Sequence, residues 1–294
     1  MSTPSLSGLP IRHLTPRDVL ACADLSEDRG WPREEHKWRL LLSAGTGFGI
    51  DDPDGGLVSA CVVTEYGPRE RPELGAIGMV LVAERYARQG VGRRLMRHVV
   101  ERAGTTPLTL HATPYGQPLY EELGFKVTGR AEMVRGRFAA GGALPDVATR
   151  AATAEDLTAI LRLDAEVFGP DRTHVITRLP AFADQLRVAV EGRDGGAGGG
   201  LIGFAAAWPN GETHVVGPLI ARDTATAQAL VASLAAGTDL PLRTDIDVRH
   251  EELLAWLKGS GLESVGLNAV MNYGASGLPG DWTRRFAPLT VAAG

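Results

Sequence analysis

The chain has 294 residues and a net charge of −5, with 44% hydrophobic and 22% charged residues. This composition is typical of a globular protein, and its mild acidity argues against a broad surface for nucleic acid. No apolar run approaches the length of a membrane span and the first residues lack a secretory signal, so we expect a cytoplasmic protein that binds neither nucleic acid nor membrane. Cys22 and Cys61 lack the spacing of metal ligands, so we expect buried thiols and no metal.

Hydrophobic periodicity in the first half predicts alternating strands and helices. In chain order the predicted elements are a strand near Ile11, helices over residues 16–25 and 32–42, a hairpin over 47–67 with its turn at Asp54-Gly55, a strand over 73–82, a helix after Gly92, a strand over 108–113 and a short helix over 117–124. Strands and helices that alternate in this way predict a mixed α/β sheet.

The second half repeats the plan of the first. Three separated matches share an offset of 137 or 138 residues: Arg12, Thr15 and Asp18 correspond to Arg150, Thr153 and Asp156, Gly124 to Gly261, and Met133 to Met271. Between the halves, residues 139–148 have the small, Gly- and Pro-containing composition of a linker. We therefore predict two domains of one fold, over residues 1–140 and 147–294, with a long hairpin loop over 191–200 in the second.

A glycine-rich turn in the first half predicts an anion site. The apolar strand over 73–82 leads to Gly90-Val91-Gly92 and then to a helix, and five arginines surround the two glycines: Arg85, Arg88, Arg93, Arg94 and Arg97. Glycines let a backbone approach a phosphate, and the first N–H groups of a helix attract it. The spacing fits neither a Walker loop nor a dinucleotide fingerprint, because the required Lys and third Gly are missing.

Two segments carry a resemblance to a known family. "VLVAERYARQGVGRRLM" (residues 80–96) resembles the acyl-CoA-binding segment of the GCN5-related N-acetyltransferases, [Q/R]-x-x-G-x-[G/A], and "PLYEELGF" (118–125) resembles their later Tyr-x-x-x-Gly-Phe segment. Ala87 departs from the pattern, since the family has Gln or Arg there. The resemblance implies an α/β fold of two tandem domains, each a mixed, mostly antiparallel sheet flanked by helices.

The resemblance also implies a co-substrate, acetyl-CoA, and residues that hold it. The main chain of Val80, Leu81 and Val82 would pair with the pantetheine arm. The amides of the following turn would hold the pyrophosphate, through Arg88, Gln89, Gly90, Val91, Gly92 and Arg93. Tyr120 aligns with the tyrosine that the family often uses as general acid near the sulfur.

The general base and the acceptor site are less defined by the sequence. Glu73, at the start of the strand that leads to Val82, is the first candidate base, and Glu65 and His111 are others. For the acceptor we expect contributions from Trp31, in the region where the family builds its acceptor pocket, from His111, and from Asp171 in the second half.

The second half lacks both signatures. After Ile220 no glycine precedes the helix, Asp223 would place negative charge at the helix start, and Leu257 stands where the first half has Tyr120. We interpret this half as a copy without a cofactor. Residues 166–175 resemble a segment of tandem acetyltransferases with such a degenerate C-terminal domain, and the Asp171-Arg172 pair in it is expected to be exposed.

The function implied is acetyl transfer from acetyl-CoA to a primary amine of a small molecule or peptide by direct attack. An acyltransferase that uses another donor, and an acyl-CoA-binding sensor or scaffold without catalysis, remain alternatives. A transferase that uses aminoacyl-tRNA is disfavoured because no extended basic stripe is present. The repeat makes the chain an internal pseudo-dimer, which is compatible with a monomer or a homodimer.

Overall fold

The computed structural model describes residues 6–192 and 200–294, so most of the predicted loop at 191–200 lies outside the described residues. In the first half the elements are η1 (Leu6–Gly8), β1 (Ile11–Leu14), η2 (Pro16–Asp18), α1 (Val19–Asp28), α2 (Glu35–Ala44), β2 (Thr46–Asp51), β3 (Leu57–Tyr66), β4 (Leu74–Val82), η3 (Glu84–Tyr86), α3 (Val91–Ala103), β5 (Leu108–Ala112), α4 (Gln117–Glu122) and β6 (Lys126–Gly136).

The second half runs through the same sequence of elements. They are β7 (Thr149–Ala151), η4 (Ala154–Asp156), α5 (Leu157–Phe168), α6 (Thr173–Ile176), α7 (Leu179–Phe182), β8 (Gln185–Val190), β9 (Leu201–Asn210), β10 (Thr213–Ala221), α8 (Thr224–Ala235), β11 (Leu242–Asp247), α9 (Glu251–Gly259), β12 (Leu262–Tyr273) and a short final strand, β13 (Arg285–Ala287). The mixed, mostly antiparallel sheet with flanking helices and the two tandem domains are confirmed.

The starts of the two halves are built alike. Arg12 reaches Asp18 at 2.7 Å, and Arg150 reaches Asp156 at the same distance. In both halves a capping box joins the threonine to the aspartate three residues later, Thr15 to Asp18 and Thr153 to Asp156. The start of the second helix differs from the prediction: α2 begins at Glu35 and not at Pro32, because Glu34 adopts a left-handed conformation, with φ of 48°.

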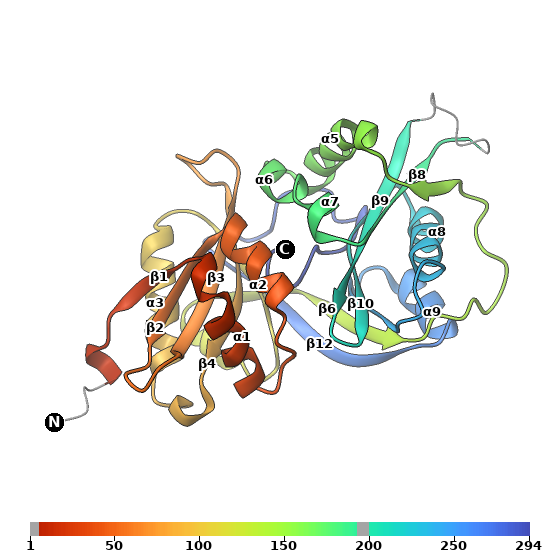
Figure 1. Ribbon diagram of the computed structural model, residues 1–294. Coiled ribbons are helices and arrows are strands. Elements are labelled where there is room, and N and C mark those ends of the chain that lie inside the picture. The colour runs from red at the N-terminus through yellow and green to blue at the C-terminus, as the bar shows by residue number, and fades with distance from the viewer. Residues whose placement is uncertain (1–5, 193–199) are drawn as a thin grey trace.

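The two halves exchange their last strands. The sheet in the described residues has 13 strands, twelve of them in the order β1-β2-β3-β4-β5-β12-β6-β11-β10-β9-β8-β7. β12 of the second half therefore pairs with β5 of the first, and β6 of the first half pairs with β11 of the second. β6 and β12 also pair with each other, and they join the two halves in the lower centre of Figure 1.

Helices cover both faces of the sheet in the first half. Leu95, Met96 and Val99 of α3 pack in one core cluster with Ile77 and Leu110 of the sheet. On the opposite face, α1 and α2 pack in another cluster with residues of β3 and β4. This second face looks toward the other half, and we call it the junction face.

The chain leaves β13 and ends between the two halves, where the letter C stands in Figure 1. Ala292 and Ala293 belong to the core cluster of the junction face. In the described part of the chain, no helix is both long enough and apolar enough to cross a membrane.

Candidate functional site

The centre of the first half is a place where two parallel strands stop pairing. β4 and β5 pair only from Gly75 to Ile77, opposite Leu108 to Leu110. On its other side β4 carries a bulge: Gly78 pairs with Val62 and Leu81 with Ala60, so Met79 and Val80 together face Cys61. Beyond Ile77 the backbone of β4 therefore pairs with none of the described strands on the β5 side.

The bulge holds a strained residue. Met79 has φ of 53° although it is not glycine, and its side chain is 4% exposed. Such a conformation costs about 1–3 kcal/mol and is most often found at functional sites. Met79 and Gly78 were not predicted as site residues, because neither residue type indicates a bulge. A finer comparison of the halves could have found them, since Gly217-Pro218 stands at the corresponding place.

The glycine turn lies where β4 runs into α3. Arg88 and Gly90 have φ of 59° and 80°, and Gly90 is the residue that caps α3 without a side chain. The first hydrogen bond of the helix joins Arg94 N–H to Gly90 O at 3.0 Å, so the amides before it have no helical acceptor. A Cβ on Gly90 would meet nothing within 4 Å. The turn thus presents donors to open space, as an anion site requires.

Most of the arginines around this turn are committed to other residues. Arg85 pairs with Asp52, Arg93 pairs with Glu122, and Arg94 donates to the carbonyl oxygens of Leu6 and Leu9. These three side chains are therefore held by other parts of the protein, so an anion at the turn would rely mainly on main-chain amides. Arg88 is exposed beside the free amides.

Tyr120 lies on the α3 side of the sheet. Its side chain is 8% exposed, shares a core cluster with Cys61 and Leu95, and packs edge-on against Phe125 with ring centroids 6.0 Å apart. Burial raises the pKa of its hydroxyl, so the group stays protonated at neutral pH. It can therefore act only as a proton donor there.

Glu73 lies away from this site. It precedes β4, it is exposed, and its N–H donates to Tyr66 O at 2.8 Å across the β3–β4 turn. Six residues of extended chain separate it from Met79, which is about 20 Å. A general base has to come within hydrogen-bond reach of the reacting proton. The structure therefore does not bring Glu73 together with Tyr120 and the glycine turn.

His111 lies on the junction face, one residue after the last β4–β5 pair. Burial lowers the pKa of its imidazole to about 4, and the nearby Arg285 acts in the same direction. The ring also has a hydrogen-bond contact with the backbone of Val291. Arg285 is stacked between the rings of Phe168 and Trp282, at 4.5 and 4.4 Å from their centroids, and burial lowers its pKa to about 9. The site thus has a neutral imidazole on this face.

The other two residues predicted for the acceptor, Trp31 and Asp171, are both exposed. Trp31 is 39% exposed just after α1, and its backbone N–H donates to the carbonyl oxygen of Ser26. Asp171 is exposed and caps Thr173, whose N–H lies 2.8 Å from the carboxylate and lowers its pKa. The Asp171-Arg172 pair was predicted wrongly, because Arg172 is 2% exposed and binds Asp164 through two of its nitrogens.

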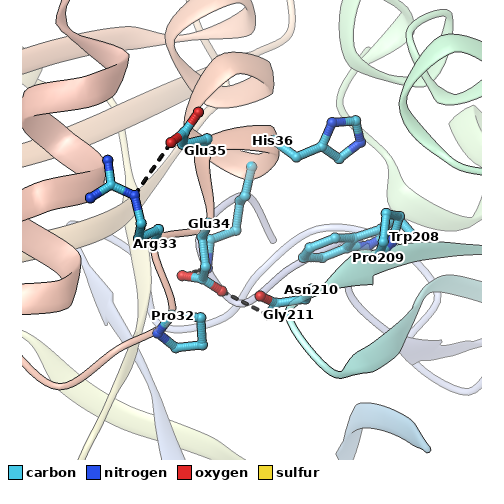
Figure 2. A pocket seen from close by; sticks show the side chains of 10 residues that line it. Pro32, Arg33, Glu34, Glu35, His36, Trp208, Pro209, Asn210 and Gly211 are labelled. Atoms are coloured by element: carbon cyan, nitrogen blue, oxygen red, sulfur yellow. Dashed lines mark hydrogen bonds and ion pairs between the residues drawn. The ribbon is translucent and has the colours of Figure 1, made fainter. Parts of the chain in front are cut away.

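A cavity of about 290 Å³ opens between the start of α2 and the β9–β10 turn. Figure 2 shows its two walls: residues 32–36 from the first half and Trp208 to Gly211 from the second. Lys37 pairs with Glu34 at 2.5 Å, and Asn210 Nδ2 donates to the other oxygen of Glu34 at 2.8 Å.

Polar atoms around this cavity are buried without partners. In the part of the chain that the structure describes, Asn210 Oδ1 and Trp208 Nε1 have no hydrogen bond, and both residues line the cavity. Burial lowers the pKa of Lys37 and raises that of the neighbouring Asp245. This group was not predicted from the sequence, because Lys37 occupies an ordinary polar position of an amphipathic helix.

In the second half, the bulge of β10 and the start of α8 correspond to the bulge of β4 and the glycine turn, and both are satisfied by other residues of the chain. Pro218, which follows Gly217 in the bulge of β10, has no N–H. β13 pairs with β10 just beyond this bulge, so the strand has a partner where β4 has none. Asp223 caps α8 by accepting from the N–H of Thr226 at 2.8 Å. The start of α8 is therefore closed by a side chain of the protein itself.

Across residues 6–192 and 200–294, no group of three or more His, Cys, Asp or Glu side chains is placed to hold a metal ion.

Two stretches of the chain, residues 60–138 and 160–287, match families that are both described as "Acetyltransferase (GNAT) domain". The curated "Uncharacterized N-acetyltransferase YitH" of Bacillus subtilis (strain 168) is 28% identical over 231 residues, which cover 76% of this chain and 77% of that protein.

Solved structures share the whole architecture. A putative acetyltransferase from Pyrococcus horikoshii matches with a TM-score of 0.80 and 18% identity, over 100% of this chain and 99% of that one. A tandem GNAT protein from the clavulanic acid biosynthesis pathway matches with a TM-score of 0.63 and 14% identity, over 93% and 100% of the two chains. At these identities the likeness shows the fold.

Proposed function

Because this chain is a tandem-domain member of the GCN5-related N-acetyltransferase superfamily, we propose that its first half, residues 1–140, transfers an acetyl group from acetyl-CoA to a primary amine of a small molecule or peptide. Residues 147–294 form the cofactor-free partner domain. One observation carries the proposal: the helix start after β4 is open and uncapped, whereas its counterpart after β10 is capped by Asp223.

The residues of the open turn fit the diphosphate of a coenzyme. The amides from Arg88 to Arg93 precede or begin α3, where the helix dipole favours negative charge. The space before Gly90 is clear, and Gly92 lies against Val82 and Leu119. In the proposal the main chain of Val80, Leu81 and Val82, unpaired on the β5 side, takes the pantetheine arm, and the amides take the diphosphate.

Bound acetyl-CoA would supply a thioester carbonyl that an amine can attack, with the sulfur as leaving group. The bulge at Met79 and Val80 presents backbone amides where β4 has no partner strand. Such fixed donors stabilise the negative charge that develops on a carbonyl oxygen under attack. Tyr120, kept protonated by burial, donates its proton to the departing thiolate, and the proton that the amine nitrogen loses passes through water and restores the tyrosine.

The acceptor amine approaches from the junction face in this proposal. His111 lies on this face, and the cavity lined by Glu34 and Asn210 opens on it beside α2. A pKa of about 4 is too low for an efficient base at neutral pH, so we assign His111 the role of orienting the amine through a hydrogen bond. Trp31, Asp171 and Glu73 have no part in it.

Calorimetry with acetyl-CoA and a thiol-release assay over a panel of amines test the proposal. We expect binding by the full chain and release of the coenzyme thiol with at least one amine. A panel of acyl-CoA donors of increasing chain length then identifies the preferred donor. Binding without turnover for every amine and donor, unaltered by Tyr120→Phe, would favour an acyl-CoA sensor, and failure to bind any acyl-CoA would refute both functions.

A further inference from the structure

The last residues of the chain lie across the central strands of both halves. We call residues 288–294 the closing segment. A Cβ added to Gly217 would collide with the backbone oxygens of Pro288 and Leu289, and a Cβ added to Gly78 would collide with the backbone of Ala292. Only glycine allows so close an approach. One segment thus rests on the equivalent bulge of each half.

The closing segment covers the junction face of the predicted transfer site. Ala292 and Ala293 belong to the core cluster that contains Met79 and Leu81 of β4 and Trp38 of α2. Val291 meets His111 of β5. The opposite face carries α3 and Tyr120. The segment therefore lies on the other side of the sheet from the general acid, directly over the bulge.

Side chains from both halves hold the segment. Tyr66 of β3 donates its hydroxyl hydrogen to Ala293 O, and Arg172 Nη1 donates to Gly294 O at 3.1 Å. Arg172 is itself held by Asp164 and lies over the ring of Phe168, 3.9 Å from the centroid. The desolvation of two buried charges costs about as much free energy as their attraction provides. A buried ion pair is therefore weak evidence for a role in stability alone. This pair fixes the position of the Arg172 side chain, which donates to Gly294.

We propose that the closing segment is the junction-side wall of the acyl-transfer site, and that Arg172 is the positioning residue that holds this wall against Gly78. The inference rests on the proposed function of the first half. It gives the cofactor-free half a part in the reaction: Arg172 keeps the segment closed over the thioester position, so that water is excluded there and the amine has to enter beside the segment.

An opened wall lets water replace the amine. Water then attacks the thioester carbon, the carbon–sulfur bond breaks, and acetate and the free coenzyme thiol are released. This hydrolysis needs only acetyl-CoA as the probe, so it can be measured without knowledge of the acceptor.

The test uses the full chain with Asp164→Leu/Arg172→Met, which replaces the buried pair by apolar side chains and leaves no unpaired charge. We expect the rate of acetyl-CoA hydrolysis without amine to rise at least fivefold, while the dissociation constant of acetyl-CoA changes less than twofold. Tyr66→Phe should give a smaller rise, and Arg172→Lys an intermediate one. The matched control is Arg150→Met, which breaks an ion pair at the start of the same half and leaves the Asp156 cap in place.

A second readout is independent of the coenzyme. Ala292→Cys places a thiol in the wall, and the native thiols, Cys22 and Cys61, are buried. We expect a disulfide reagent to label Cys at 292 at least tenfold faster with the Asp164/Arg172 double substitution than without it. Equal labelling rates, or unchanged hydrolysis in a folded variant that binds acetyl-CoA, would overturn the inference. Absence of acetyl-CoA binding by the unaltered chain would instead overturn the proposed function.

Discussion

Gly90 and Asp223 are the N-cap residues of equivalent helices in the two halves, and only Asp223 caps its helix with a side chain. Gly90 precedes α3 in a left-handed conformation and offers no side chain to its amides. Asp223 precedes α8 in an extended conformation, and its carboxylate accepts hydrogen bonds from the N–H and the hydroxyl of Thr226. One helix start is left for a ligand, and the other is satisfied from within the chain.

Gly90→Asp should therefore weaken acetyl-CoA binding. The new carboxylate would compete for the amides of α3 and repel the diphosphate, and we expect the dissociation constant to rise tenfold or more, which is about 1.4 kcal/mol. Calorimetry measures it. Gly30→Asp is the matched control, because Gly30 also has a left-handed conformation, with φ of 72°, and open space around it. Equal affinities for the two variants would contradict the assignment of the turn.

Tyr120→Phe should reduce turnover and leave binding intact. The hydroxyl is expected to protonate the leaving sulfur, and loss of a general acid lowers a rate by about 100-fold or more. We expect kcat to fall on that scale, while the dissociation constant of acetyl-CoA changes little. Tyr115→Phe, at a side chain that is 66% exposed, serves as control. A kcat for the Tyr120 variant close to that of the control would show that the proton comes from elsewhere.

His111 should make the protein less stable as the pH falls. Its folded-state pKa of about 4 lies below the unfolded value of 6.5, so the unfolded chain binds a proton first. Stability is retained above pH 6.5 and is lost as the pH falls toward 4, by about 2 kcal/mol at pH 5. Urea denaturation at pH 7 and pH 5 measures this loss, which His111→Asn should reduce. His13→Asn, at an exposed side chain, provides the comparison. A loss of the same size in both variants would be inconsistent with a buried neutral imidazole.

Lys37→Met should destabilise the junction of the halves. It would leave Glu34, whose side chain is 3% exposed, buried without its ion-pair partner and with Asn210 as its hydrogen-bond donor. An uncompensated buried charge costs about 3–5 kcal/mol. We expect such a drop in the free energy of unfolding, and recovery of most of it in Glu34→Gln/Lys37→Met. Arg33→Gln, a neighbour with a 40% exposed side chain, should cost less than about 1 kcal/mol. A small effect of Lys37→Met would mean that water reaches Glu34.

The repeat was visible in the sequence because local signals carry it. Thr15 and Asp18 form the same capping box as Thr153 and Asp156, and capping depends on neighbours three residues apart. The acidic residue at Asp223 was likewise a local signal, and in the structure its carboxylate lies at the helix start as the N-cap. The roles of the arginines were predicted less well, because the partner of Arg85 is 33 residues away and that of Arg94 more than 80.

By itself the sequence determined the elements, the tandem arrangement and the open turn at Gly90, since each depends on residue types within one or two turns of chain. Only the tertiary structure decided that β6 and β12 change sides, that Arg172 binds Asp164 and not Asp171, and that Ala292 lies on Gly78. The physical reason is that these are contacts between distant segments. Their energy comes from packing and desolvation in the assembled junction. No pattern within a short stretch of sequence indicates such contacts.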